Sequence, residues 1–211
     1  GFYDRLIDEL LAAGITPWIT LFHWDYPAAL YKRGGWLNHE SPLWFEEYAR
    51  LIVDRFSDRV TNWFTLNEPA CFIGLGHASG IHAPGLRLSA AEVNRAWHHA
   101  LLAHGRAVSV IRNGSKSPGA RIGFAPVFRT CIPATETDAD IEAARRMMFE
   151  GRERSMFEPG WSLGPVFDGA YPDDLLRLWG DDAPVIQDGD MNIIHQPLDF
   201  LGFNIYQSSL V

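Results

Sequence analysis

The apolar positions at the start of the chain change their spacing at Gly14. From Phe2 to Leu11 they recur at the three- and four-residue spacing of an amphipathic helix, and Gly14 follows where a helix commonly ends in a left-handed residue. The next run, Ile15 to Phe22, is short, nearly all apolar and rich in β-branched and aromatic residues. This pattern predicts a helix followed by a strand that is buried on both faces.

The same alternation continues along the chain. Ser41 and Pro42 are expected to be the N-cap and first residue of one helix, and Ser89 to Glu92 form the capping box of a longer one. The helix that begins at Ser41 is expected to end at about Phe56, and the helix capped by Ser89 at about Arg112. Strands are expected from Asn62 to Leu66, from Arg121 to Ala125 and from Phe200 to Tyr206, and two further helices at about 138–151 and 172–179.

Alternating helices and buried strands predict an α/β fold with parallel strands and helical crossovers. Such a chain forms either an open doubly wound sheet or part of a (β/α)8 TIM barrel. The glycine-rich segment Gly74 to Gly80 has the wrong spacing for a dinucleotide-binding loop and does not directly follow a strand, so we expect a flexible loop there. With 211 residues, of which 47% are hydrophobic and 21% charged, one domain over residues 1–211 is the default.

Charge and cysteine content narrow the possible partners and the compartment. A formal net charge of −8 argues against nucleic acid, because phosphate binding needs Lys and Arg, and favours a neutral small molecule. The chain starts with mixed charges instead of a signal peptide, and the apolar stretch from Leu10 to Trp24 is interrupted by Gly14 and Pro17, so no membrane span is expected. Cys71 and Cys131 suggest neither a disulfide framework nor a zinc knuckle, which favours a cytoplasmic setting.

Polar side chains follow three of the four predicted strands. In a barrel, the active site lies at the C-terminal ends of the strands, so these side chains would meet at one edge. An imidazole, two amides, aromatic rings and a carboxylic acid would converge there, contributed by His23, Trp24, Asn67, Glu68, Asn204 and Tyr206.

Glu68 is the candidate proton donor of such a site. Cleavage of a glycosidic bond takes one protonated and one ionised carboxyl group. Glu68 follows a strand that contains Trp63 and Phe64, and a poorly solvated carboxyl group can stay protonated near neutral pH. The alternative is a buried structural acid paired with an arginine, but the position of Glu68 at a strand end, in an Asn-Glu-Pro turn, favours catalysis.

The segment Thr65-Leu66-Asn67-Glu68-Pro69 resembles the acid/base signature of family 1 glycoside hydrolases, whose members are mainly β-glucosidases. Four further segments resemble the family in the right order, so that the resemblance covers the whole chain: Thr20 to Pro27, Gly34 to Asn38, Pro165 to Pro172 and Asp199 to Asn204.

The resemblance implies a role for each candidate residue. Glu68 would be the catalytic acid/base, His23 and Asn67 would bind hydroxyl groups of the sugar, and Trp24 would shape the wall of its subsite. Tyr206 matches the tyrosine that holds the nucleophile, with Asn204 nearby, although Ile205 stands where many members have a second tyrosine. The family needs no metal or organic cofactor.

The resemblance also implies that about four βα units, strands 3 to 6 of the barrel, are present. The nucleophile of the family lies in a Thr-Glu-Asn-Gly motif on the seventh strand, which this sequence lacks, and Asp25, Glu46 and Glu47 are not convincing substitutes. A retaining mechanism needs its two carboxyl groups roughly 5 Å apart. This chain alone is therefore not expected to complete the reaction.

Three interpretations follow. The chain could be a portion of a retaining β-glucosidase that acts on a small β-glycoside or oligosaccharide. It could instead be a half barrel, whose unpaired edge strands favour a homo-oligomer or association with the missing half. Finally, it could be a non-catalytic sugar-binding protein that keeps His23, Asn67 and Glu68 as hydrogen-bonding groups. His98, His99 and His104 lack the spacing of a helical zinc site and are expected to be structural or solvent-facing.

Overall fold

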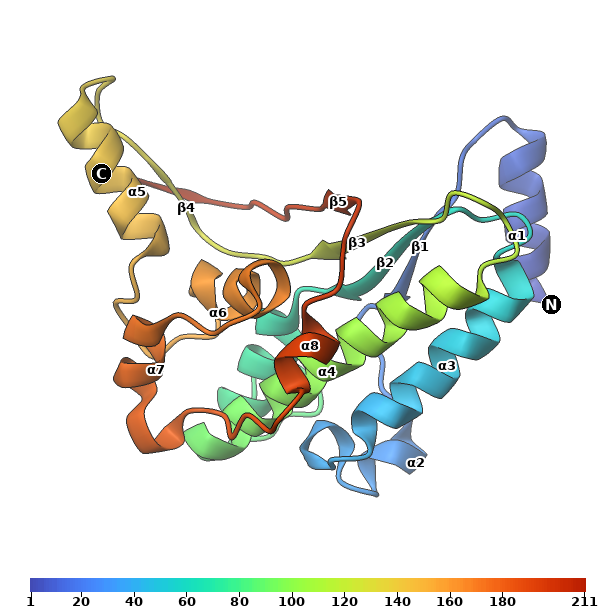
Figure 1. The fold of residues 1–211 in the computed structure, drawn as a ribbon, viewed down its shortest axis with the longest axis horizontal. Coiled ribbons are helices and arrows are strands. Elements are labelled where there is room, and N and C mark those ends of the chain that lie inside the picture. The colour runs from blue at the N-terminus through green and yellow to red at the C-terminus, as the bar shows by residue number, and fades with distance from the viewer.

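The computed structural model describes residues 1–211 and is built on a four-stranded parallel sheet. Its strands are β1 (Trp18–Phe22), β2 (Asn62–Asn67), β3 (Arg121–Ala125) and β5 (Phe200–Leu201), and they pair in the order β1-β2-β3-β5. Each strand therefore lies beside the next one along the chain, which is the order of a barrel wall. The sheet leaves β1 and β5 as open edges, so the architecture is a partial barrel (Figure 1).

Long helices connect the strands. In Figure 1, α3 (Ser41–Phe56) and α4 (Ala90–Gly114) run side by side along the sheet, while α1 (Phe2–Ala12) precedes the first strand. The remaining helical elements are α2 (Ala28–Tyr31), η1 (Gly35–Leu37), η2 (Ala70–Ala78), α5 (Asp138–Phe149), α6 (Pro159–Leu163), η3 (Gly164–Asp168), α7 (Asp173–Trp179), η4 (Gly180–Asp182) and α8 (Asp190–Ile194).

The helix signals in the sequence are confirmed at α1 and α4, whereas at α3 the predicted helix to Phe56 is present but its predicted N-cap is wrong. Gly14 has the left-handed φ of 72° expected after α1. Ser89 caps α4 through a reciprocal capping box, because its Oγ accepts from the Glu92 N–H and the Glu92 carboxylate accepts from the Ser89 N–H. Ser41 was expected to be an N-cap, but α3 already begins at Ser41. Its buried hydroxyl has no partner, so it does not act as a cap.

The glycine-rich segment is helical as far as Ala78, which corrects the expected flexible loop. Residues Ala70–Ala78 form the π-helix η2, with Phe72 and Ile73 buried in the core. A Cβ atom on Gly76 would lie 2.6 Å from the carbonyl oxygen of Ala83, so glycine is needed for this close approach. Burial of the apolar side chains therefore stabilises a helix where the glycine content suggested mobility.

The fourth strand is shorter than predicted because the neighbouring strand is interrupted. β3 ends at Ala125 and is followed by Pro126, which has no N–H to donate to a sheet. The strand from Phe200 therefore ends at Leu201, and the chain pairs again only by an isolated bridge at Asn204. Beyond it, β6 (Ser208–Leu210) pairs in parallel with β4 (Thr130–Ile132) in a second, two-stranded sheet.

The core between the sheet and the helices is rich in aromatic side chains. Trp63, Trp97 and Trp161 are fully buried. The indole N–H of Trp97 donates to the Trp161 carbonyl at 3.1 Å, and that of Trp161 donates to Asn94 Oδ1 at 3.2 Å. These bonds satisfy the polar atoms of two large buried rings and attach α6 to α4.

Two of the α4 histidines are structural, as predicted. His104 is completely buried, with its Nδ1 2.6 Å from the Thr65 hydroxyl of β2. His98 is also buried, and its two ring nitrogens contact Tyr171 Oη and Asp190 Oδ2. Together they attach α4 to the sheet and to the segment before β5.

Candidate active site

Glu68 stands where the chain leaves β2 in a strained turn. Its φ of 48° is left-handed, a conformation that non-glycine residues rarely adopt outside sites where the surrounding structure enforces it. The Glu68 N–H donates to the Ala125 carbonyl of β3 at 2.8 Å, next to an irregularity in the β2–β3 register between Phe64 and Asn67. Such irregularities change the direction in which side chains point at the end of a sheet.

Both carboxyl oxygens of Glu68 accept hydrogen bonds, and the residue is only 3% exposed. Asn204 Nδ2 donates to Oε1 at 2.6 Å, and the Tyr206 hydroxyl contacts the same oxygen at 3.4 Å. The Cys71 thiol donates to Oε2 at 3.2 Å. Three donors from two parts of the chain therefore fix the orientation of this carboxyl group.

Amide side chains connect Glu68 to the end of β1. Asn204 Nδ2 also donates to Asn67 Oδ1 at 2.9 Å, and Asn67 Nδ2 lies 3.4 Å from His23 Nε2. The contacts form a continuous polar row, His23–Asn67–Asn204–Glu68, across the ends of three strands. The structure thus brings together side chains that the sequence placed after separate strands.

Trp24 forms one wall of this row. Its φ is 80°, a second strained position, and its indole N–H donates to the Asn67 carbonyl at 3.0 Å. The ring centroid lies 5.2 Å from that of His23 and 5.3 Å from that of His82. The backbone strain therefore places an aromatic face beside the imidazole and amide groups.

Sequence reasoning missed Cys71 and His82. Cys71 lies three residues after Glu68, about one helical turn, but no helix was expected at this point of the chain. Burial and the neighbouring Glu68 raise the pKa of the Cys71 thiol to about 12, so it stays protonated and acts as a donor. The charge of Glu68 also raises the pKa of Tyr206, which keeps its hydroxyl proton.

A cavity of about 680 Å³ opens beside Glu68 and is large enough for a small ligand. Cys71 and Tyr206 line it together with side chains from the segments around β4, α5 and residues 152–159. Two further carboxyl groups, Glu153 and Glu158, lie in this lining, and burial raises the pKa of Glu158. Chemically, the cavity offers Glu68 as a proton donor or acceptor among fixed hydrogen-bond donors.

No group of three or more His, Cys, Asp or Glu side chains is arranged to hold a metal ion. Both cysteines are free thiols. None of the helices combines the length and apolar character that crossing a lipid bilayer requires.

The family model of glycosyl hydrolase family 1 matches residues 1–211. β-Glucosidase A of Thermotoga maritima is 42% identical over 212 residues, covering 100% of this chain and 45% of that protein. The 1,4-β-D-glucan glucohydrolase of Thermotoga neapolitana is 40% identical, covering 100% of this chain and 47% of that protein. The chain thus spans somewhat less than half the length of these relatives.

Solved structures agree with the sequence comparison. The T. maritima β-glucosidase in complex with deoxynojirimycin superimposes with a TM-score of 0.84 at 41% identity, covering 99% of this chain and 45% of that one. The virulence factor SghA of Agrobacterium tumefaciens gives a TM-score of 0.83 at 38% identity, covering 99% of this chain and 44% of that one. The predicted partial (β/α)8 barrel is confirmed, and the chain belongs to glycosyl hydrolase family 1.

Proposed function

We propose that this chain provides the acid/base half of a retaining glycoside hydrolase of the β-glucosidase type, with Glu68 as the proton donor and acceptor. The observation that carries the proposal is the pair of contacts made by Asn204, which binds both Glu68 Oε1 and Asn67 Oδ1. This amide joins the ends of two strands and fixes the reactive carboxyl group. The relatives named above as β-glucosidases make glucosides the first substrates to test.

The chemistry needs Glu68 in two protonation states. In the first step, protonated Glu68 gives its proton to the glycosidic oxygen while a carboxylate nucleophile attacks the anomeric carbon and the leaving group departs. In the second step, ionised Glu68 takes a proton from water, which attacks the same carbon and releases the nucleophile. Hydrogen bonds from Asn204 and Cys71 stabilise the carboxylate that exists between these steps.

The other residues of the row bind the sugar in this proposal. His23 and Asn67 are placed to hydrogen-bond hydroxyl groups, and the Trp24 ring offers an apolar wall to the C–H groups of the sugar. Tyr206 is 81% exposed and reaches Glu68 only through its hydroxyl, so most of its ring is free to contact a further segment. That position suits a residue that orients the nucleophile.

We propose that the nucleophile comes from barrel strands outside this sequence. No second carboxyl group contacts the polar row around Glu68. The open edges β1 and β5 would be covered by those strands, or by a second copy of the chain. Trp18 on β1 is 47% exposed although its ring packs on Phe64 and Phe200, so this face of the sheet is open and those strands would cover it too. A reducing, cytoplasmic location is supported by the two free thiols.

The first experiment measures the solution mass of this chain and its activity on an aryl β-glucoside. We expect little turnover by the chain alone, and turnover when a second polypeptide supplies the missing strands. Glu68→Gln should abolish that turnover, and azide should partly restore it on an activated glucoside by replacing water in the second step. Glu47→Gln, which removes an equal charge from an exposed site on α3, is the control and should have no effect.

Three results would contradict parts of the proposal. Full activity of Glu68→Gln in the complemented enzyme would exclude Glu68 as the acid/base. Activity of the unaccompanied chain would show that the nucleophile lies within it. In that case Glu158→Gln becomes the decisive variant, because Glu158 lines the same cavity as Glu68. Sugar binding without turnover in every preparation would favour a binding protein.

A further inference from the structure

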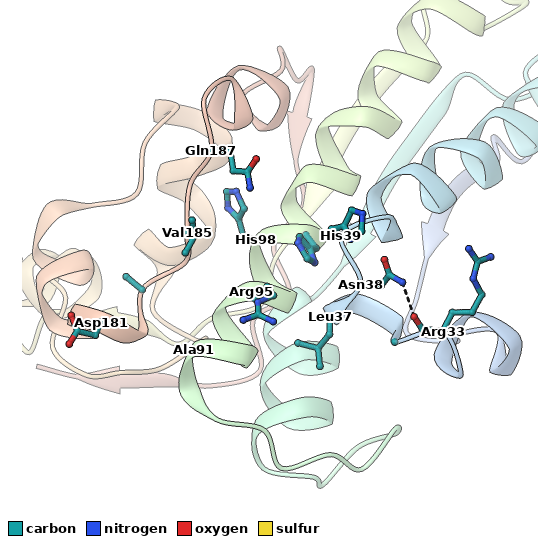
Figure 2. Close-up of a pocket in the computed structure, with 13 residues that line it drawn as sticks. Arg33, Leu37, Asn38, His39, Ala91, Arg95, His98, Asp181, Val185 and Gln187 are labelled. Atoms are coloured by element: carbon teal, nitrogen blue, oxygen red, sulfur yellow. Dashed lines mark hydrogen bonds between the residues drawn. The ribbon is translucent and has the colours of Figure 1, made fainter.

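A second hollow lies outside the polar row around Glu68 and shares none of its residues. Figure 2 shows it between the segment 33–39, the first turns of α4 and the segment 181–187. Its volume is about 510 Å³. Its walls therefore come from three stretches of chain that are far apart in sequence but lie around one opening.

Basic side chains predominate in this hollow. Two arginines and three histidines line it, against a single carboxylate, Asp181; the basic residues are Arg33, His39, Arg95, His98 and His99. The chain as a whole has a net charge of −8. A concentration of basic side chains on an acidic protein is therefore a local feature that composition does not explain.

Three of these basic groups have hydrogen-bonding capacity to spare. Arg33 pairs with Glu40, and both nitrogens of His98 are occupied, as described above. By contrast, the side chains of Arg95 and His39 make no hydrogen bond or ion pair within the chain, and His99 uses only its Nδ1. The hollow therefore presents three side chains with unused hydrogen-bonding capacity, of which the Arg95 guanidinium carries a permanent charge.

His99 is held so that protonation would add a donor. Its Nδ1 lies 2.8 Å from the Trp36 carbonyl, which can only accept, so Nδ1 carries a proton in the neutral ring. The free nitrogen is Nε2, which becomes a second N–H when the ring is charged. Burial lowers the pKa of His99, and the positive charges of His98, Arg95 and His39 lower it further. An anion bound among these groups would relieve that repulsion.

We propose that this hollow binds a phosphate or phosphomonoester anion through Arg95, His39 and His99. Phosphate carries close to two negative charges at neutral pH and offers several strong acceptor oxygens, which match the unpaired Arg95 guanidinium and its two neighbouring imidazoles better than a single carboxylate would. Leu37, Ala183 and Val185 also line the hollow and leave room for an apolar or sugar-like substituent on the phosphate. The inference is independent of the proposed hydrolase activity.

The test titrates inorganic phosphate into this chain by calorimetry at constant ionic strength, with chloride as the reference anion. We expect saturable binding, weakened about tenfold or more by Arg95→Ala and by His39→Ala, since each removes a charge-assisted hydrogen bond. Arg5→Ala is the matched control, because Arg5 is an exposed arginine of α1 with no ion pair, and it should bind phosphate like the unmodified chain.

Folding of each variant is checked by circular dichroism, and His39→Ala decides the matter if Arg95→Ala does not fold, because His39 is exposed. Three outcomes would overturn the proposal: no saturation at tens of millimolar phosphate, an equal response to chloride at the same ionic strength, or equal weakening by Arg5→Ala. Phosphate affinity that is unchanged in the His39 and Arg95 variants would place any bound anion elsewhere.

Discussion

An added methyl group at Gly105 should destabilise the fold more than one at any other position. A Cβ atom built there would lie 1.8 Å from the carbonyl oxygen of Ile193 and 2.9 Å from Ile194 Cα. The backbone of α4 therefore runs directly against the backbone of α8, the helix that leads into β5 and Asn204. Gly105→Ala should push these two helices apart.

The expected loss of stability can be worked from this contact. An ordinary carbon–oxygen separation is about 3.5 Å, so the backbones must move apart by roughly 1.5 Å or more. Overpacking of this kind costs about 1–3 kcal/mol, and partial exposure of the fully buried Ile194 adds about 1–2 kcal/mol. The better helix propensity of alanine offsets about 1 kcal/mol. We therefore expect a net loss of about 1–4 kcal/mol, or roughly 2–16 °C in Tm.

The assay is urea and thermal unfolding followed by circular dichroism and tryptophan fluorescence. Gly114→Ala, at the C-terminal end of α4, is the control. A Cβ there would meet only Val53 Cγ1, at 3.7 Å, so this variant should be unchanged or more stable by up to about 1 kcal/mol. A Gly105→Ala variant as stable as the unmodified chain would refute the close packing of α4 on α8.

Three further predictions concern protonation and the polar row. Burial lowers the pKa of His104 to about 3, so the unfolded chain binds a proton that the native chain does not, and stability falls as the pH drops from 6.5 towards 3. Between pH 7 and 5 the unmodified chain should lose about 2 kcal/mol more than His104→Leu in urea unfolding, and equal losses would contradict this. Iodoacetamide at about pH 8 should label Cys131 in the native chain. It should label Cys71 only after unfolding, because burial raises the pKa of this thiol to about 12. Labelling of Cys71 in the native chain, detected by mass spectrometry, would contradict this prediction. In the complemented enzyme, Asn204→Ala should lower kcat/KM on an aryl glucoside roughly 10- to 100-fold, because a hydrogen bond to charged Glu68 contributes about 1.5–3 kcal/mol. An unchanged kcat/KM would show that Asn204 has no part in the mechanism.

Local patterns in the sequence determined most of the helices and strands. The capping box at Ser89 and the left-handed Gly14 depend on neighbours within a few residues, so the beginning of α4 and the end of α1 could be predicted. The position of Glu68 directly after a buried strand was equally local. It indicated which edge of the sheet carries the polar groups, because parallel strands all end at the same edge.

Only the tertiary structure decided which of these groups touch. Asn204 and Glu68 are separated by 136 residues, and their contact depends on strand register and on how Pro126 ends the pairing of β3. The helix that carries Cys71 was missed because its stability comes from buried apolar side chains packed by the rest of the fold, against the preference of its glycines. The hollow lined by Arg95 and His39 likewise has no signature in sequence. Long-range contacts of this kind follow from packing of whole elements, which no local pattern of residues specifies.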